Sequence, residues 1–143
     1  MGNVKNYDPK KFIITFGGIP ATGFADGTFI SVTSPSQTFT KIVGADGEVA
    51  RAKGNDNTNE VTITLLQTSL TNDYFSSIHK IDKATNQGKL ILAIVDLEGT
   101  TIMSWSQAWI RQLPDTERSK EIGENAWIFD TGQIDAVNIG GNF

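Results

Sequence analysis

The sequence contains no cysteine and a single histidine, His79. The absence of cysteine excludes disulfides, thiolate nucleophiles, iron–sulfur clusters and cysteine-ligated zinc. His79 has no acidic residue at a spacing that would orient it as a catalytic base. The chain also has no G-x-S-x-G nucleophile elbow and no glycine loop of the phosphate-binding type. We therefore expect no enzymatic activity and no cofactor.

Positive charge and long apolar runs are also scarce. The 143 residues include 12 Lys and Arg against 16 Asp and Glu, which gives a net charge of −4. Proteins that hold nucleic acid cluster basic residues, and this composition does not suggest such a cluster. No apolar stretch approaches the ~20 residues of a membrane-spanning helix, and residues 1–12 lack the apolar core of a secretory signal. We expect no membrane association and no specific hold on DNA.

Short β-rich runs separated by glycine-containing turns make up most of the chain. Alternation of apolar and polar residues is typical of strands with one buried face, whereas the continuous apolar run 89–96 is typical of a strand buried on both faces. The predicted strands cover residues 11–16, 28–34, 38–44, 47–54, 60–67, 89–96 and 100–110, and AWIFDTG and QIDAVNI form a last pair within 126–139. Trp105 and Trp109, four residues apart, leave a helix possible within 100–110, but the composition favours a strand.

Residues 71–84 have a different periodicity. Leu70, Tyr74, Ile78 and Ile81 recur at helical spacing, and Thr71 is placed to act as the N-cap. Residues 86–88 supply the stop. The sequence therefore predicts a single domain spanning 1–143 that is mainly β, an antiparallel sandwich or barrel of about eight strands with one flanking α-helix.

Candidate sites for metals or sugars are weak. Asp56 and Glu60 lie in the segment GNDNTNE, but its pattern does not match an EF-hand, and such residues are common in turns, so no metal site is expected. Asp96 and Glu98 flank a turn, where charges normally leave a core. The tryptophans could form a stacking platform, but core or subunit-interface positions are favoured. Trp109 and Leu92 are both expected in the core.

Three stretches resemble a known family. They are ITFGGIPATGFADGTFISV at 14–32, residues 41–78, and LILAIVDLEGTTIMSWSQAWI at 90–110. Within them lie G-F-A-D-G at 23–27, VGADGEVAR at 43–51, and L-Q-T-S-x-x-N-D at 66–73. Together they resemble the tail tube proteins of bacteriophages with contractile tails. The resemblance covers roughly residues 7–130 and implies a β-sandwich or barrel with a flanking helix.

The resemblance also implies a role. Six copies would form a ring, and stacked rings would form the inner tube of the tail, a conduit for ejection of the genome into the host. The implied partners are further copies of the chain, the tail sheath protein, the tape-measure protein, and baseplate and tail terminator proteins. Assembly would occur in the host cytoplasm and the product would lie in the virion. The negative net charge suits a lumen that DNA crosses without specific binding.

Contacts between rings need a projection from the folded body. The polar hairpin 41–61 is the best candidate, and Arg51, Lys53, Asp56 and Glu60 are its candidate inter-ring residues. The N-terminal arm, residues 1–10, and the loop 113–125 are further candidates for ring or sheath contacts.

Two other functions remain open from the sequence. A ring protein of a type VI secretion or pyocin-like tube would share the fold and would be distinguished by neighbouring genes. A small carbohydrate-binding β-sandwich would need an exposed patch of aromatic residues.

Overall fold

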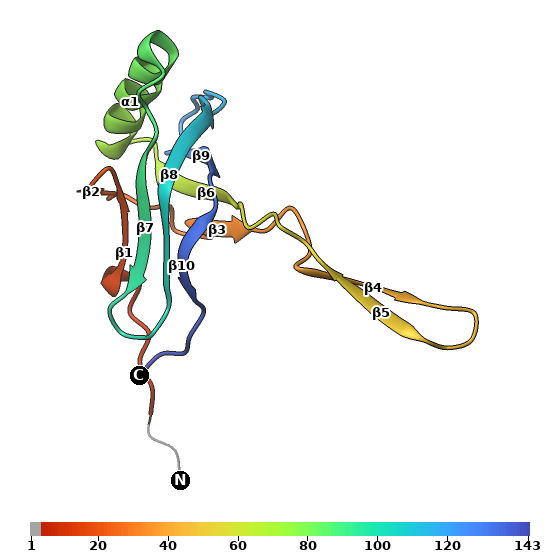
Figure 1. Cartoon of the computed structure of the whole chain (residues 1–143). Helices are drawn as coiled ribbons and strands as arrows, with labels where there is room; N and C mark the ends of the chain where they lie inside the picture. The colour runs from red at the N-terminus through yellow and green to blue at the C-terminus, as the bar shows by residue number, and fades with distance from the viewer. Residues whose placement is uncertain (1–3) are drawn as a thin grey trace.

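Antiparallel strand pairing accounts for most of the fold (Figure 1). The computed structural model describes residues 4–143, which contain ten strands, one α-helix and a short 3₁₀ turn, η1 (Pro9–Lys11). The strands are β1 (Phe12–Phe16), β2 (Ile19–Pro20), β3 (Ile30–Thr33), β4 (Phe39–Val43), β5 (Val49–Lys53), β6 (Glu60–Leu66), β7 (Leu90–Asp96), β8 (Ile102–Gln112), β9 (Glu124–Thr131) and β10 (Ile134–Asn138). The helix is α1 (Thr71–Thr85). The expected mainly β, antiparallel fold with one helix is confirmed.

The long strand β8 connects two groups of strands. Its first half pairs with β7 and β10, and its second half pairs with β9. The order along the sheet is β2-β1-β7-β8-β9-β6-β3, with β10 beside β8. The register of β8 shifts against all three of its neighbours. Such bulges bend a strand and increase its twist, so the sheet can fold over on itself.

Inward-facing side chains from both groups of strands form one core. Phe16 of β1 and Phe129 of β9 have ring centroids 5.0 Å apart, although two strands separate them in the sheet. Phe75 of α1 contacts both rings edge-on, at 6.0 and 5.2 Å. The helix thus closes the end of the folded sheet. The largest fully buried side chains are Trp105, Trp127, Phe16, Phe75, Phe129, Ile14, Ile63, Leu65, Leu92, Ile94 and Val61.

Two asparagines accept hydrogen bonds from the two buried tryptophans. Trp105 Nε1 donates to Asn59 Oδ1 at 3.0 Å, and Trp127 Nε1 donates to Asn72 Oδ1 at 2.9 Å. Each asparagine also donates through Nδ2 to a neighbouring segment, Asn59 to Ser34 Oγ and Asn72 to the Leu66 carbonyl. Both indole donors are therefore satisfied inside the core; one ties the loop before β6 to it and the other ties the first turn of α1 to it.

The helix forms where its periodicity predicts, but Thr71 is not its N-cap. The N-cap position is Leu70, and Ser69 Oγ accepts the hydrogen bond from Thr71 N at 3.1 Å. Thr71 is buried, and its hydroxyl accepts from Thr22 N instead. Asn86 ends the helix in a left-handed conformation. Within residues 4–143, no helix combines the length and apolar character needed to cross a membrane.

Trp109 is half-buried, so the expectation that it belongs to the core is wrong. Strict alternation from buried Trp105 would turn Trp109 inward. Leu92 faces Trp105 and Leu90 faces Ala108, so β8 has one extra residue between these pairs. The bulge reverses the alternation, and Ala108 and Ile110 become the buried residues.

Replacing Leu92 with alanine should therefore lower the free energy of unfolding by about 2–5 kcal/mol, because Leu92 is completely buried and its loss leaves a cavity. Trp109→Ala should cost clearly less, because this side chain is already partly in water. Urea unfolding of the two variants measures both values. An equal or larger loss for Trp109→Ala would contradict the described bulge.

Asn59→Ala should lower the free energy of unfolding by about 1–3 kcal/mol, because it leaves the buried Trp105 N–H without an acceptor. Asn55→Ala is the matched control, since Asn55 is exposed in the same loop. Near-ultraviolet circular dichroism and urea unfolding report the indole environment and the stability. If the two variants unfold alike, the Trp105–Asn59 bond contributes no stability.

Candidate functional site

One element lies outside the folded body. Strands β4 and β5 and their connecting turn, residues 39–53, form a two-stranded sheet that pairs with no other strand, and we call this element the ribbon. Figure 1 shows the ribbon projecting sideways from the rest of the chain. Every residue of both strands is exposed. The ribbon ends at Lys53, so the expected hairpin 41–61 was too long by the connecting segment and the first residues of β6.

The two faces of the ribbon differ in chemistry. Directly opposed residues share a face, and faces alternate along each strand. The pairing Lys41↔Arg51 puts both cations on the face that also carries Lys53, whereas Ile42↔Ala50 lies on the other face. The basic face consists of Phe39, Lys41, Val43, Val49, Arg51 and Lys53. The uncharged face consists of Thr40, Ile42, Ala50 and Ala52.

Neither face is covered within the described residues. Ile42 is 73% exposed and Val49 is 64% exposed. The Arg51 guanidinium lies 4.2 Å from the centroid of the Phe39 ring, a cation–π contact within the ribbon. An isolated two-stranded hairpin is at best marginally stable in water. A ribbon with uncovered apolar side chains on both faces is typical of a surface that another molecule covers.

The turn of the ribbon is well defined. Gly44 N donates to the Glu48 carbonyl at 2.7 Å, and Asp46 Oδ1 accepts from Glu48 N at 3.1 Å. Gly47 has a φ of 89°, a conformation that favours glycine. The VGADGEVAR stretch therefore specifies a turn, with Asp46 and Glu48 as the acidic residues at the tip.

The base of the ribbon is fixed to the body by side chains. Asp56 accepts hydrogen bonds from the Thr58 hydroxyl, from Thr58 N at 3.0 Å and from Ser36 Oγ at 2.9 Å, so it links the two segments that enter and leave the ribbon. These bonds, the Thr58 hydroxyl first, lower the pKa of Asp56 below its ordinary value. Asn57 N donates to Gln133 Oε1 at 3.0 Å. The base is thus an ordered junction.

The four candidate inter-ring residues lie in three different places. Arg51 and Lys53 share the basic face of the ribbon, and Asp56 lies at its base. Glu60 belongs to β6 and forms an ion pair with Arg111 at 2.8 Å; Arg111 also pairs with Asp130 at 2.6 Å.

Hydrogen bonds to Asp130 and Glu60 raise the pKa of Arg111. Lys41, which the sequence did not single out, completes the basic face, because strand register brings it opposite Arg51.

The expected N-terminal arm, 1–10, is described only from residue 4. Asn6 N donates to the Phe143 carbonyl at 2.7 Å, so this arm meets the other end of the chain. The expected loop 113–125 is irregular as far as Gly123, and its last two residues belong to β9. Gln67 holds the end of this loop, since its N and Oε1 both bond to the backbone of Gly123.

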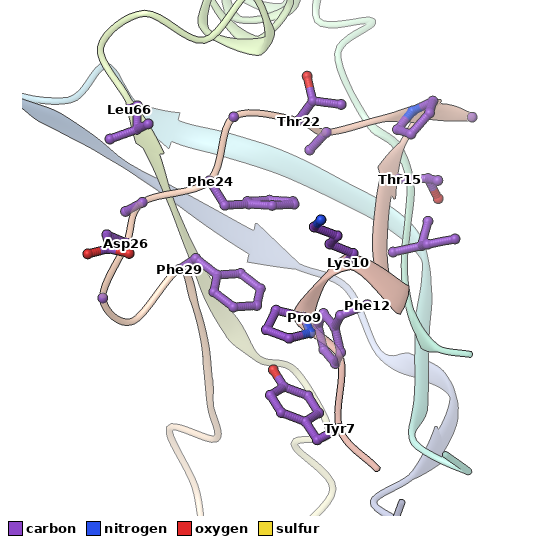
Figure 2. Close-up of a pocket in the computed structure, with 17 residues that line it drawn as sticks. Tyr7, Pro9, Lys10, Phe12, Thr15, Thr22, Phe24, Asp26, Phe29 and Leu66 are labelled. Atoms are coloured by element: carbon purple, nitrogen blue, oxygen red, sulfur yellow. The ribbon is translucent and has the colours of Figure 1, made fainter. Parts of the chain in front are cut away.

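An apolar cleft lies between β1 and the segment 21–29 and has a volume of about 1070 Å³. Figure 2 shows Phe24 above Phe29, with Phe12 to the right of Phe29 and Tyr7 below them. The rings of Phe12 and Phe29 meet edge-on at 5.9 Å. The charged residues that line the cleft are Lys10 and Asp26. With one charge of each sign and mainly apolar walls, the cleft has no evident chemistry beyond packing.

The G-F-A-D-G stretch has a structural role that sequence reasoning did not identify. Gly23 has a φ of 72°, and a Cβ there would lie 2.6 Å from Ser69 Cβ. Its carbonyl accepts from Leu66 N, and Ser69 Oγ donates to the Thr22 carbonyl at 2.5 Å. This stretch and the L-Q-T-S-x-x-N-D stretch are therefore two sides of one contact beside the start of α1.

The carboxylates of residues 4–143 do not form a metal site, and Asp96 serves a turn. Asp96 is buried, and its oxygens accept from Glu98 N at 3.0 Å and Asn142 Nδ2 at 2.8 Å, which stabilises the turn after β7. Among residues 4–143, no three His, Asp or Glu side chains lie close enough together to bind a metal ion.

Known proteins share both the sequence pattern and the fold. Residues 16–139 match the family model of the bacteriophage PhiTE tail tube protein. Structural protein ORF10 of Pseudomonas phage KPP10 is 26% identical over 135 residues, which cover 89% of this chain and 78% of that protein.

Solved structures of contractile injection systems have the same fold. The anti-feeding prophage cap, a tube-terminating cap, aligns with a TM-score of 0.61 over 94% of this chain and 93% of that one, at 16% identity. The sheath/tube terminator of the extracellular contractile injection system PVC, in the extended state, aligns with a TM-score of 0.58 over 94% and 98%, at 16% identity. A chain of the PVC sheath-tube complex aligns with a TM-score of 0.57 over 96% and 93%, also at 16% identity.

The family model covers all but the two ends of the chain, and the KPP10 relative is itself a phage structural protein. The resemblance stated from the sequence is therefore confirmed, and it supports a structural role in a phage tail. The chain belongs to the bacteriophage PhiTE tail tube protein family.

Proposed function

We propose that six copies of this chain, each a single tube domain, form a ring, and that stacked rings form the inner tube of a phage tail. The genome passes through the lumen of this tube into the host. The net charge of −4 supports transport without retention, because a lumen that is not basic does not bind phosphates. Membership of the tail tube family supports the tube itself.

The ribbon is the observation that carries this proposal. It exposes apolar side chains on both faces and has no contact partner among the described strands. A surface of this kind that meets a different surface on the next copy produces a ring or an open-ended filament instead of a closed dimer. We assign the ribbon to contacts between successive rings, with Arg51 and Lys53 in the interface.

Contacts within a ring need a second surface. β3 bonds only to β6 and β10 bonds only to β8, so each has an unpaired edge among the described strands. Open edges join neighbouring chains readily, and closure around a ring removes them from solvent. We propose that strand edges close the ring, whereas the ribbon joins rings along the tube.

Other tail proteins would complete the assembly. We propose that the chain contacts a sheath protein outside the tube, a tape-measure protein inside it during assembly, and baseplate and terminator proteins at its ends. A sheath-tube complex and a sheath/tube terminator among the structural neighbours support the sheath and terminator contacts. Assembly would take place in the host cytoplasm.

A tube of a contractile injection system is the second candidate function. It is favoured by one observation: the similar solved structures come from an anti-feeding prophage and from an extracellular injection system. The carbohydrate-binding alternative has less support, because Trp105 and Trp127 are buried in the core. Neighbouring capsid genes would distinguish a phage tube from an injection system.

Shortening the ribbon should abolish tube elongation without unfolding the body. Gly54 N donates to the Thr38 carbonyl at 2.7 Å, and hydrogen-bonded pairs alternate along an antiparallel ladder, so Thr40 and Ala52 are also such a pair. Residues 41–51 between them can therefore be replaced by the two-residue turn Asn-Gly, which needs a hydrogen-bonded pair at its ends. The shortened chain should keep its thermal midpoint but form no tubes in negative-stain electron microscopy, with or without a baseplate preparation. Long tubes from the shortened chain would exclude a necessary role in stacking.

A further inference from the structure

The basic face of the ribbon is electrostatically strained in the isolated chain. Lys41 and Arg51 are directly opposed, and like charges in that position destabilise a strand pair. Lys53 lies two residues further along β5 on the same face. Among the described residues, the ion pairs within 4.0 Å all involve Arg111, so none neutralises these three cations. The basic face therefore favours contact with a surface that supplies carboxylates.

A groove at the C-terminal end of β8 is lined by residues of negative charge. It lies where the irregular loop 113–123 passes the start of β9, and its volume is about 360 Å³. Its lining includes Asp115, Glu117 and Glu124 and no cation. Its remaining lining residues are Gln112, Leu113, Pro114, Ala126 and Ile128. We call it the acidic groove.

The acidic groove is held in place by backbone contacts. Gln67 fixes Gly123, directly before Glu124, with two hydrogen bonds of 2.9 and 3.0 Å. Ala126 pairs with Thr64 of β6. Arg118, which follows Glu117 in the sequence, donates through its guanidinium to the Glu117 carbonyl. Glu124 is thus exposed on an ordered strand, and Asp115 and Glu117 are exposed in the irregular loop beside it.

The charge distribution of the chain matches these two surfaces. The ribbon carries three cations and two carboxylates, so its net charge is +1 and the rest of the chain carries −5. Each surface combines three like charges with apolar residues, Phe39, Val43 and Val49 on the ribbon and chiefly leucine, proline and isoleucine in the groove. Contact would relieve the repulsion within both surfaces and remove apolar area from water.

Within one chain the ribbon does not reach the acidic groove (Figure 1). Figure 1 shows the ribbon projecting away from the end of β8 where the loop to β9 lies. A contact between two separate surfaces on identical chains is heterologous and propagates from copy to copy. We propose that the basic face of the ribbon docks into the acidic groove of a second copy in the adjacent ring. This pairing rests on the proposed stacking role of the ribbon and names its receiving surface.

Disulfide trapping tests the pairing directly, because the chain has no cysteine of its own. Val49→Cys places a thiol on the basic face and Ala126→Cys places one in the groove; both positions are exposed and keep all six charges. Under mild oxidation, an equimolar mixture should yield the mixed dimer. Trapping detects transient encounters, so it gives a result even where the purified chain does not polymerise.

Two matched variants decide the specificity of trapping. Ala52→Cys lies on the uncharged face of the same strand, and Asp26→Cys lies at the apolar cleft. The yield from Val49→Cys with Ala126→Cys should exceed the yield of either control pair, Ala52→Cys with Ala126→Cys or Val49→Cys with Asp26→Cys. An equal or higher yield at the cleft would overturn the proposal, as would equal trapping from both ribbon faces.

Charge reversal gives a second, independent test. One variant carries Lys41→Glu, Arg51→Glu and Lys53→Glu, and the other carries Asp115→Lys, Glu117→Lys and Glu124→Lys. In either variant alone, the ribbon and the groove carry charges of the same sign. Assembly should therefore fall by about tenfold or more, and so should disulfide trapping when Val49→Cys and Ala126→Cys are introduced into that variant. Mixed together, the two variants restore both attractive pairings and should recover the wild-type yield as an alternating assembly.

The outcomes separate this pairing from the proposed function. Wild-type yields from either reversed variant alone would overturn the pairing. If the chain with the shortened ribbon assembles as well, both the pairing and the stacking role of the ribbon are wrong. If the reversed variants assemble but the chain with the shortened ribbon does not, the ribbon joins rings through a surface other than the acidic groove. Circular dichroism and thermal melting of each variant establish that the compared chains are folded.

Discussion

The fold depends on one strand that belongs to two groups of strands. β8 pairs with β7 and β10 along its first half and with β9 along its second, and bulges absorb the change of direction. Because β8 bends, β1 and β9 face each other and their phenylalanines meet in the core. The helix then covers one end of the sheet, and the two asparagine–tryptophan bonds fix the start of α1 and the loop before β6 to the core. The ribbon takes no part in this packing, so both of its faces remain available for contacts with other chains.

The body and the ribbon differ in how far each satisfies its own packing. The body buries its own core and satisfies both buried indole donors, whereas the ribbon leaves apolar and basic side chains in water. Hydrophobic burial supplies affinity in such a contact, and charge selects the register and excludes wrong orientations. In the proposed contact, surface charge that is unfavourable in the monomer would select the correct partner surface.

Much of this organisation is readable in the sequence, because alternation and helical spacing are local patterns. α1 and all the strands except the short β2 were predicted for that reason, whereas the choice of the hairpin as a projection followed from the family resemblance. The errors have long-range causes. Thr71 accepts from Thr22 instead of capping its own helix, and the bulge in β8 turns Trp109 outward. The ribbon ends at Lys53 because the following segment is bonded to Gln133, far along the chain. Lys41 was missed because its partnership with Arg51 exists only once the strands are paired.

The bonded base gives the ribbon the mechanics of a lever. Five residue pairs at about 3.4 Å each make an arm of roughly 17 Å, so a rotation of about 10° at the base would displace the tip by about 3 Å. That displacement would separate charged groups that need to be within a few ångströms. The bonds of Asp56, Asn57 and Asn59 therefore set the angular tolerance of the whole arm. In a repeating polymer, a small angular error at each step adds to the next, so the straightness of a tube would be decided at this junction, remote from the surfaces that touch.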